Sequence, residues 1–173
     1  MVLRLYIDTR SQPCRALLYF LRHHKVDFEE KHLDLLKGET RTPEHLELNP
    51  AHKLPFLHDT ENDLRLSESG AILRYVVNKL EIDSEFYPRE DLRRRALIDK
   101  YLDWSFAYVR QTTSTLYGVA ILLPLLTGIQ PEPALIAEKE ASFKSTMEQL
   151  DEIFAQREYL VDNSVTYADI YLL

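Results

Sequence analysis

A short polar turn at residues 9–12 holds the side chains of this sequence that are best placed for chemistry. Ser11 and Gln12 follow an alternating apolar segment and directly precede Pro13, and proline favours the first turn of a helix. The free N–H groups at a helix start carry roughly half a positive charge and stabilise anions. A hydroxyl at Ser11 is therefore suited to hold a thiolate.

Other side chains near this turn offer alternatives to Ser11 as the active group. Tyr6 and Thr9 also carry hydroxyls, and Cys14 carries the only thiol of the chain. We expect Tyr6 to pack against its neighbours. Cys14 lies one residue inside the predicted helix, where it is expected to be a small buried apolar side chain. Ser11 itself could serve only as a helix cap.

The elements that would position this turn alternate between strand and helix patterns over the first 80 residues. A strand-helix-strand opening normally has parallel strands and a right-handed crossover. Thr42 and Pro43 predict a cap and a first helical residue. The predicted order is βαβαββα, with strands at 3–7, 28–33, 54–58 and 64–66 and helices at 13–24, 42–49 and 67–80.

Pro55 is an irregularity within the third predicted strand. A proline has no N–H to give to a sheet, so it must begin the strand or lie where the strand edge has another use. One such use is pairing between the backbone of Leu54 and a ligand. An ordinary turn proline is the alternative.

Beyond residue 80 the sequence predicts a linker and then only helices. Residues 81–90, around Tyr87 and Pro88, lack apolar periodicity and are expected to link two domains. Apolar residues at three- and four-residue spacing predict helices at about 92–118 and 136–154. The stripe expected to pack along the first of these comprises Leu92, Ala96, Tyr101, Trp104, Tyr108 and Leu116.

The end of the sequence carries a strong helix start. Thr166 and Asp169 have the spacing of a capping box, and Val165 and Ile170 that of a hydrophobic staple. Only about two turns follow before Leu173, and so short a helix needs packing to be stable. We expect the native polypeptide to continue.

Composition excludes several classes of function. The net charge of −7 and a pI near 5.4 argue against a nucleic-acid binder. No apolar run approaches the roughly 20 residues of a membrane span, so we expect a soluble, cytoplasmic protein without membrane contact. One cysteine and six scattered histidines give no metal-ligand spacing, so no metal is expected.

Five features in this order together resemble the cytosolic glutathione S-transferases, most closely their theta class. They are SQPCRA at 11–16, KLP at 53–55, SESGAI at 67–72, the all-helical second half, and TYAD at 166–169. The resemblance runs from Leu3 to Leu173. It implies a thioredoxin-like domain at 1–80 with Pro55 in the cis form, a linker at 81–90, an all-α helical-bundle domain at 91–173 that is incomplete at its C-terminal end, and a homodimer.

The resemblance also implies a site for glutathione as co-substrate. Ser11 matches the theta-class catalytic serine, with Gln12 beside it. Glu68 and Ser69 match the pair that holds the γ-glutamyl end. The Leu54 backbone would pair with the cysteinyl unit.

Three further residues complete the expected site, and one of them departs from the pattern. Lys53 would face the glycyl carboxylate of glutathione. Thr40 stands where theta proteins often have a histidine, so this contact is open, with Thr40 or Arg41 as replacements. Arg110 matches an arginine that points toward the thiol in some theta enzymes, and a surface ion pair is its alternative.

The expected activity is conjugation of the glutathione thiolate to a small electrophile, as in detoxification. Two other functions stay open. A binding or assembly module without catalysis could keep this fold, and a thioltransferase or isomerase of the same superfamily would depend on Cys14.

Overall fold

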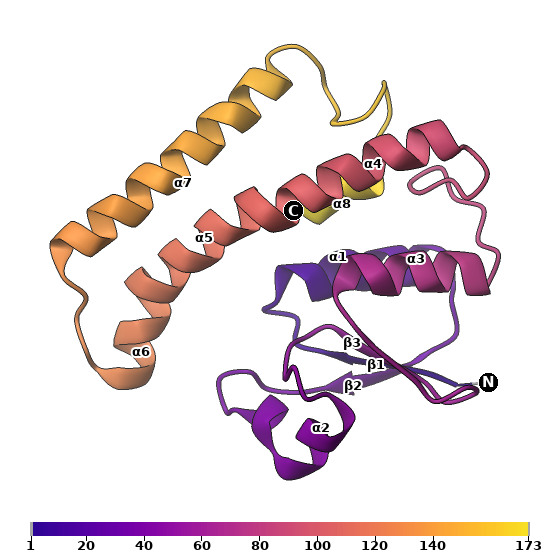
Figure 1. The fold of residues 1–173 in the computed structure, drawn as a ribbon, viewed down its shortest axis with the longest axis horizontal. Helices are drawn as coiled ribbons and strands as arrows, with labels where there is room; N and C mark the ends of the chain where they lie inside the picture. The colour runs from indigo at the N-terminus through magenta and orange to yellow at the C-terminus, as the bar shows by residue number, and fades with distance from the viewer. Residues whose placement is uncertain (1, 173) are drawn as a thin grey trace. The chain divides into compact units, whose positions relative to one another are not determined.

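A computed structural model describes residues 2–172, which divide between Glu90 and Asp91 into two compact units (Figure 1). We call residues 2–90 the first unit and residues 91–172 the second unit. Met1 and Leu173, the outer ends of the two predicted domains, lie outside the described residues.

The first unit contains a four-stranded mixed sheet with the order β2-β1-β3-β4. β1 pairs in parallel with β2 and antiparallel with β3, which pairs antiparallel with β4. The predicted βαβαββα order and thioredoxin-like fold are thereby confirmed. The elements are β1 (Leu3–Ile7), α1 (Gln12–His23), β2 (Glu29–His32), the 3-10 turn η1 (Glu39–Arg41), α2 (Pro43–Leu48), β3 (Phe56–Asp59), β4 (Leu64–Ser67) and α3 (Ser69–Lys79).

Alternation along β1 separates the two faces of the sheet. Leu3, Leu5 and Ile7 are almost fully buried, on the face that α1 and α3 cover side by side (Figure 1). Tyr6 points to the opposite face, where the centroid of its ring lies 5.5 Å from the centroid of the His45 ring in α2. The period of two therefore supplies a core on both sides of the sheet.

The helices of the first unit follow local signals in the sequence. Pro13 lies in the first turn of α1, as predicted. The Thr42 hydroxyl accepts a hydrogen bond from the backbone N–H of His45, which confirms it as the cap of α2. In α3 the buried face is Ile72, Leu73, Val76 and Val77. These four residues recur at the three- and four-residue spacing of one helix face.

The segment before the second unit packs against α1. Phe86 and Tyr87 are buried, and the Phe86 ring lies 4.9 Å from that of His23. The Ser84 hydroxyl is 2.8 Å from Nε2 of His24. These residues therefore contribute to the core of the first unit, although their sequence lacks apolar periodicity.

The second unit is helical throughout its described residues. From α4 to α6 the chain is one helical run in which two π-helical turns interrupt the α-helix, and Pro124 sits in the first turn of α6. The elements are α4 (Leu92–Trp104), η2 (Ser105–Val109), α5 (Arg110–Tyr117), η3 (Gly118–Leu122), α6 (Leu123–Thr127), α7 (Pro133–Phe154) and α8 (Tyr167–Leu172).

The predicted apolar stripe of the first long helix is only partly buried. Tyr101 is 8% exposed, but Leu92 is 67% and Tyr108 61% exposed, and Ala96 is exposed as well, so the prediction was wrong for these three. Leu92 begins α4 at its exposed end. Tyr108 lies in the π-helical turn η2, whose wider turn shifts later side chains off the 3.6-residue face.

The predicted cap of the helix near the C-terminal end is confirmed, while the Val165–Ile170 staple stays a prediction. The N–H and the hydroxyl of Thr166 each donate a 2.7 Å hydrogen bond to the Asp169 carboxylate, and the N–H of Leu160 donates another. α8 buries Tyr167, Ala168, Ile170 and Tyr171. A helix of six residues is thus held by its cap and by packing.

Candidate functional site

The strand register gathers the predicted site segments of the first unit at one edge of the sheet. Ile7, at the end of β1, pairs with His32, at the end of β2. Tyr6 pairs with Phe56, the first residue of β3, and Phe56 pairs with Ser67, the last residue of β4. Adjacent strands lie about 4.8 Å apart. All four strands therefore present their site-proximal ends at the same edge.

Four segments continue from these strand ends: residues 9–12, 33–41, 53–55 and 68–69. Both α1 and α3 begin in them, so two helix N-termini open at this edge. The N–H groups and dipoles of helix starts favour anions. The edge is therefore suited to a ligand with more than one negative group.

Ser11 lies at the N-cap of α1 and is half-buried. Its backbone N–H donates to the Asp8 carbonyl, and its carbonyl accepts from the N–H of Arg15. Its side chain makes no capping hydrogen bond within the described helix. The backbone of Ser11 is thus held in place, and its hydroxyl is not used as a helix cap.

The alternatives to Ser11 occupy less suitable positions. Tyr6 packs against the rings of His45 and Phe56, as expected. Cys14 is 0% exposed, which confirms that it is a buried core residue. Thr9 is exposed on the turn. A buried thiol is poorly placed for exchange with a substrate.

Glu68 and Ser69 begin α3 with an unusual backbone. Glu68 is exposed and has a φ of 70°, a left-handed conformation that costs a non-glycine residue about 1–3 kcal/mol. Ser69 is buried as the first residue of the helix. The strained residue places a free carboxylate next to a helix start.

The segment before β3 carries the cis peptide bond between Leu54 and Pro55 that the family resemblance implied. Asn49 is buried and donates a 2.8 Å hydrogen bond from its amide to the Lys53 carbonyl. Its amide also lies 3.5 Å from Nε2 of His45. The sequence reasoning missed this support, for which the i, i+4 spacing of His45 and Asn49 on α2 was the available signal.

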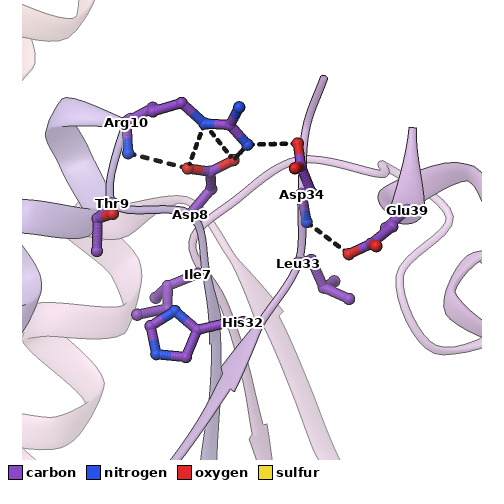
Figure 2. A pocket seen from close by; sticks show the side chains of 8 residues that line it. All are labelled: Ile7, Asp8, Thr9, Arg10, His32, Leu33, Asp34 and Glu39. Atoms are coloured by element: carbon purple, nitrogen blue, oxygen red, sulfur yellow. Dashed lines mark hydrogen bonds and ion pairs between the residues drawn. The ribbon is translucent and has the colours of Figure 1, made fainter. Parts of the chain in front are cut away.

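A hollow of about 380 Å³ lies where β1 and β2 end, next to the Ser11 turn. Figure 2 shows the side chain of Arg10 bridging two carboxylates above it, those of Asp8 and Asp34. Sequence reasoning did not identify these three residues. The hollow is lined by Ile7, Asp8, Thr9, Arg10, His32, Leu33, Asp34 and Glu39.

Electrostatics at the hollow favour ionised carboxylates. Hydrogen bonds from Arg10 lower the pKa of Asp8 to about 2 against the opposing effect of burial, and the N–H of Leu35 adds to the lowering. Arg10 also lowers the pKa of Asp34. Both carboxylates therefore stay charged at neutral pH and keep Arg10 bound between them.

The remaining predicted residues have different settings. Thr40 lies in η1 with its side chain buried, while Arg41 and Lys53 are exposed. Gln12 is the first residue of α1 and is half-buried. Arg110 begins α5 in the second unit and is half-buried. Their roles stay predictions.

No group of three or more His, Cys, Asp or Glu side chains among residues 2–172 could hold a metal ion. None of the described helices is both long and apolar enough to cross a membrane.

Comparisons with known proteins agree with this architecture. Residues 1–78 match the profile of the glutathione S-transferase N-terminal domain. Human glutathione S-transferase theta-1 is 33% identical over 171 residues, and mouse theta-2 is 33% identical over 174. These alignments cover 98% and 100% of this chain, respectively, and 70% of each relative.

Solved structures give the same result. A crystal structure of human glutathione transferase theta-2, in complex with glutathione and an unknown ligand, has a TM-score of 0.87 and 32% identity, covering 98% of this chain and 69% of that one. The apo form of human glutathione S-transferase T1-1 has a TM-score of 0.88 and 30% identity, at 98% and 70% coverage. Sequence identity over nearly the whole chain and the shared fold show that this chain belongs to the glutathione S-transferase family, among enzymes of the theta class.

Proposed function

We propose that the chain binds glutathione at this sheet edge and conjugates it to a small electrophile, with Ser11 stabilising the thiolate. The observation that carries the proposal is the position of Ser11. Its hydroxyl is not used as a cap, it lies at a helix N-terminus, and the strand register places it at the same edge as Glu68 and Ser69.

The parts of glutathione match the chemistry of the segments around Ser11. The carboxylate of the γ-glutamyl end suits Ser69 and the N-terminal amides of α3, and its ammonium suits the exposed Glu68. The backbone of Leu54, just before β3, would pair with the cysteinyl unit. Gln12 lies beside the thiol position at the start of α1.

The glycyl carboxylate requires a cation or donor on the remaining side. Lys53 and Arg41 are exposed, whereas the Thr40 side chain is buried. We therefore assign this carboxylate chiefly to the two cations, with Thr40 supporting the turn that carries Arg41.

The catalytic requirement on Ser11 is modest. A free cysteine thiol has a pKa of about 8.5, so it is mostly protonated at neutral pH. A hydrogen bond from Ser11 and the α1 dipole together need to lower the pKa of the glutathione thiol by only one or two, and each pKa unit corresponds to about 1.4 kcal/mol. The thiol proton leaves to solvent, the thiolate sulfur forms a bond to the electrophilic carbon, and the leaving group departs with its electron pair.

Several finer points belong to the same proposal. Arg110 would assist the thiolate, as the family resemblance implies. The active protein would be a cytoplasmic homodimer, as the family resemblance implies. The family relationship supports these points.

The decisive test is an ultraviolet difference titration that follows the thiolate absorbance of bound glutathione against pH. The wild type is compared with Ser11→Ala, and Thr9→Val and Tyr6→Phe serve as controls for the other nearby hydroxyls. We expect the wild type and both controls to show a bound-thiol pKa clearly below the free value. Ser11→Ala should return it toward that value and reduce conjugation of a chromogenic electrophile.

Other outcomes would point elsewhere. Binding of glutathione with an unshifted thiol would favour a binding module without catalysis. Activity that survives Ser11→Ala but is lost in Cys14→Ser would favour a thioltransferase, a role that the complete burial of Cys14 opposes.

A further inference from the structure

We propose that Arg10 is a positioning residue, which fixes Ser11 by clamping its turn onto the loop of residues 33–41. The inference rests on the proposed role of Ser11 and adds a residue that acts on the thiolate only through Ser11. Three sets of contacts in the first unit support it.

The first contacts join Arg10 to Asp8 within the turn. Its guanidinium Nε donates to both carboxylate oxygens of Asp8 at 2.9 and 3.1 Å, its Nη2 donates to one of them, and its backbone N–H donates at 2.9 Å. The Asp8 side chain is only 5% exposed. The Asp8 carbonyl in turn accepts the backbone N–H of Ser11 at 2.9 Å. Arg10 thus binds the side chain of Asp8, the residue whose carbonyl accepts the Ser11 N–H.

The second contacts extend from Arg10 to the neighbouring loop. Nη2 also donates to the Asp34 carboxylate (Figure 2). The same Asp34 oxygen accepts the N–H groups of Leu36 and Lys37, and the Asp34 N–H donates to the Glu39 carboxylate at 2.7 Å. Asp8 also reaches this loop, because it accepts the Leu35 N–H at 3.0 Å. One guanidinium therefore joins two loops that are more than 20 residues apart in sequence.

The third contact holds the turn from the side of α1. Nη1 of Arg15 donates to the carbonyls of Thr9 and Arg10, both at 3.1 Å. The two residues before Ser11 are consequently restrained by α1 as well as by the 33–41 loop. Ser11 has little freedom to move unless one of these restraints is released.

A simpler interpretation is that Arg10 makes an ordinary surface ion pair, which is worth about 0–1 kcal/mol. The contacts of Arg10 go beyond a single ion pair, because one guanidinium binds both Asp8 and Asp34. A guanidinium can serve two carboxylates at once in fixed directions, which a lysine ammonium does less well. A catalytic group displaced by about 1 Å can lose up to 100-fold in rate, so a restraint on Ser11 matters more for catalysis than for stability.

The test measures the bound-thiol pKa, and kcat and KM for glutathione, in the full chain. Arg10→Leu releases both loops. Arg22→Leu is the matched control, since Arg22 makes a similar multiple pair with Glu30 away from the Ser11 turn. Because Arg10→Leu leaves the buried Asp8 carboxylate without its cationic partner, Asp34→Asn is made as well. That change weakens the link between the loops and keeps the Arg10 pair with Asp8.

We expect Arg10→Leu to reduce kcat/KM for glutathione about 10-fold, within the range for a displaced catalytic group, and to raise the bound-thiol pKa. Asp34→Asn should reduce kcat/KM about threefold, by the same displacement to a smaller degree. Arg10→Lys should recover part of the loss, and Arg22→Leu should match the wild type.

The double variant Arg10→Leu/Ser11→Ala decides whether Arg10 acts through Ser11. If it does, the double variant is no worse than Ser11→Ala alone. Additive losses, or a folded Arg10→Leu and Asp34→Asn that both match Arg22→Leu, would overturn the inference while Ser11→Ala still upholds the proposed function. A Ser11→Ala enzyme that keeps the wild-type thiol pKa would instead overturn the proposed function.

Discussion

The two units of this chain bury their apolar side chains to very different degrees. In the first unit, α1 alone buries Pro13, Cys14, Ala16, Leu17, Leu18, Phe20 and Leu21. In the second unit, none of the described residues of α5, η3 and α6 is buried, and α7 buries only Thr146. Large apolar residues on these helices are exposed, among them Tyr117, Ile121, Leu125 and Leu126.

This difference reflects two ways of stabilising helices: burial in a core, or helical propensity with few buried contacts. The first unit closes its own core around the sheet and can therefore fix a site at the sheet edge. The second unit has buried contacts where α4 and α8 pack, including Ile98 and Leu102. Its outer helices depend on helical propensity and on contacts between α5 and α7. The following changes test this comparison.

The largest expected effect comes from truncating the core of the first unit. Leu17 in α1 is 0% exposed, so Leu17→Ala should lower the free energy of unfolding by about 3 kcal/mol, through lost burial and a cavity. Urea unfolding followed by far-ultraviolet circular dichroism measures this change. Leu17→Met, which conserves volume, should cost less than about 1.5 kcal/mol. Equal losses in the two variants would mean that the α1 core is loosely packed.

Asp8 is expected to make the free energy of unfolding depend on pH in the acid range. Its folded-state pKa of about 2 lies below the ordinary value of 3.8 for this carboxyl. Its contribution, about 2 kcal/mol, is therefore complete above about pH 4 and is lost as the pH falls toward 2. Urea unfolding at several pH values should show a shallower acid slope in Asp8→Asn than in the wild type. Parallel acid slopes in the two proteins would contradict the role assigned to Arg10 in lowering this pKa.

A somewhat smaller effect is expected at the cap of α8 in the second unit. Asp169→Ala removes the acceptor of three hydrogen bonds and should cost about 1–2 kcal/mol. Trp104 in α4 is the only tryptophan, so its fluorescence reports unfolding of the second unit. Asp151→Ala, an exposed position on α7, is the control and should change little. An equal loss of stability in Asp151→Ala would mean that removal of a negative charge from a helix, and not the lost cap, causes the effect.

Local signals predicted the elements of the fold well. Alternation gave β1, the Thr42-Pro43 pair gave the start of α2, and the Thr166/Asp169 spacing gave the cap of α8. Each of these depends on residues within one turn or strand, so their physical cause is contained in a short stretch of sequence.

The contacts that sequence reasoning missed depend on pairing between distant segments. Arg10 and Asp34 meet because β1 and β2 are parallel with Ile7 opposite His32, and no local pattern gives that register. Burial of Phe86 likewise requires α1 to be in place, because its ring packs near those of Tyr19 and His23. Ser11 and the Leu54 backbone were candidates from local patterns, and the family resemblance added Glu68 and a role for each of the three. The register shows why such distant segments reach one edge.

The smallest expected effect concerns the exposed helices themselves. Leu125 on α6 is 65% exposed, so Leu125→Gln should change the free energy of unfolding by less than about 0.5 kcal/mol, since glutamine is also a good helix former. The control within the same unit is Leu102→Gln, at a position with 0% exposure, which should cost several times more because it buries an unpaired amide. Fluorescence of Trp104 during urea unfolding measures both. A large loss of stability in Leu125→Gln would show that this side chain is covered in solution. The second unit would then also bury its apolar side chains, against a surface outside the described residues.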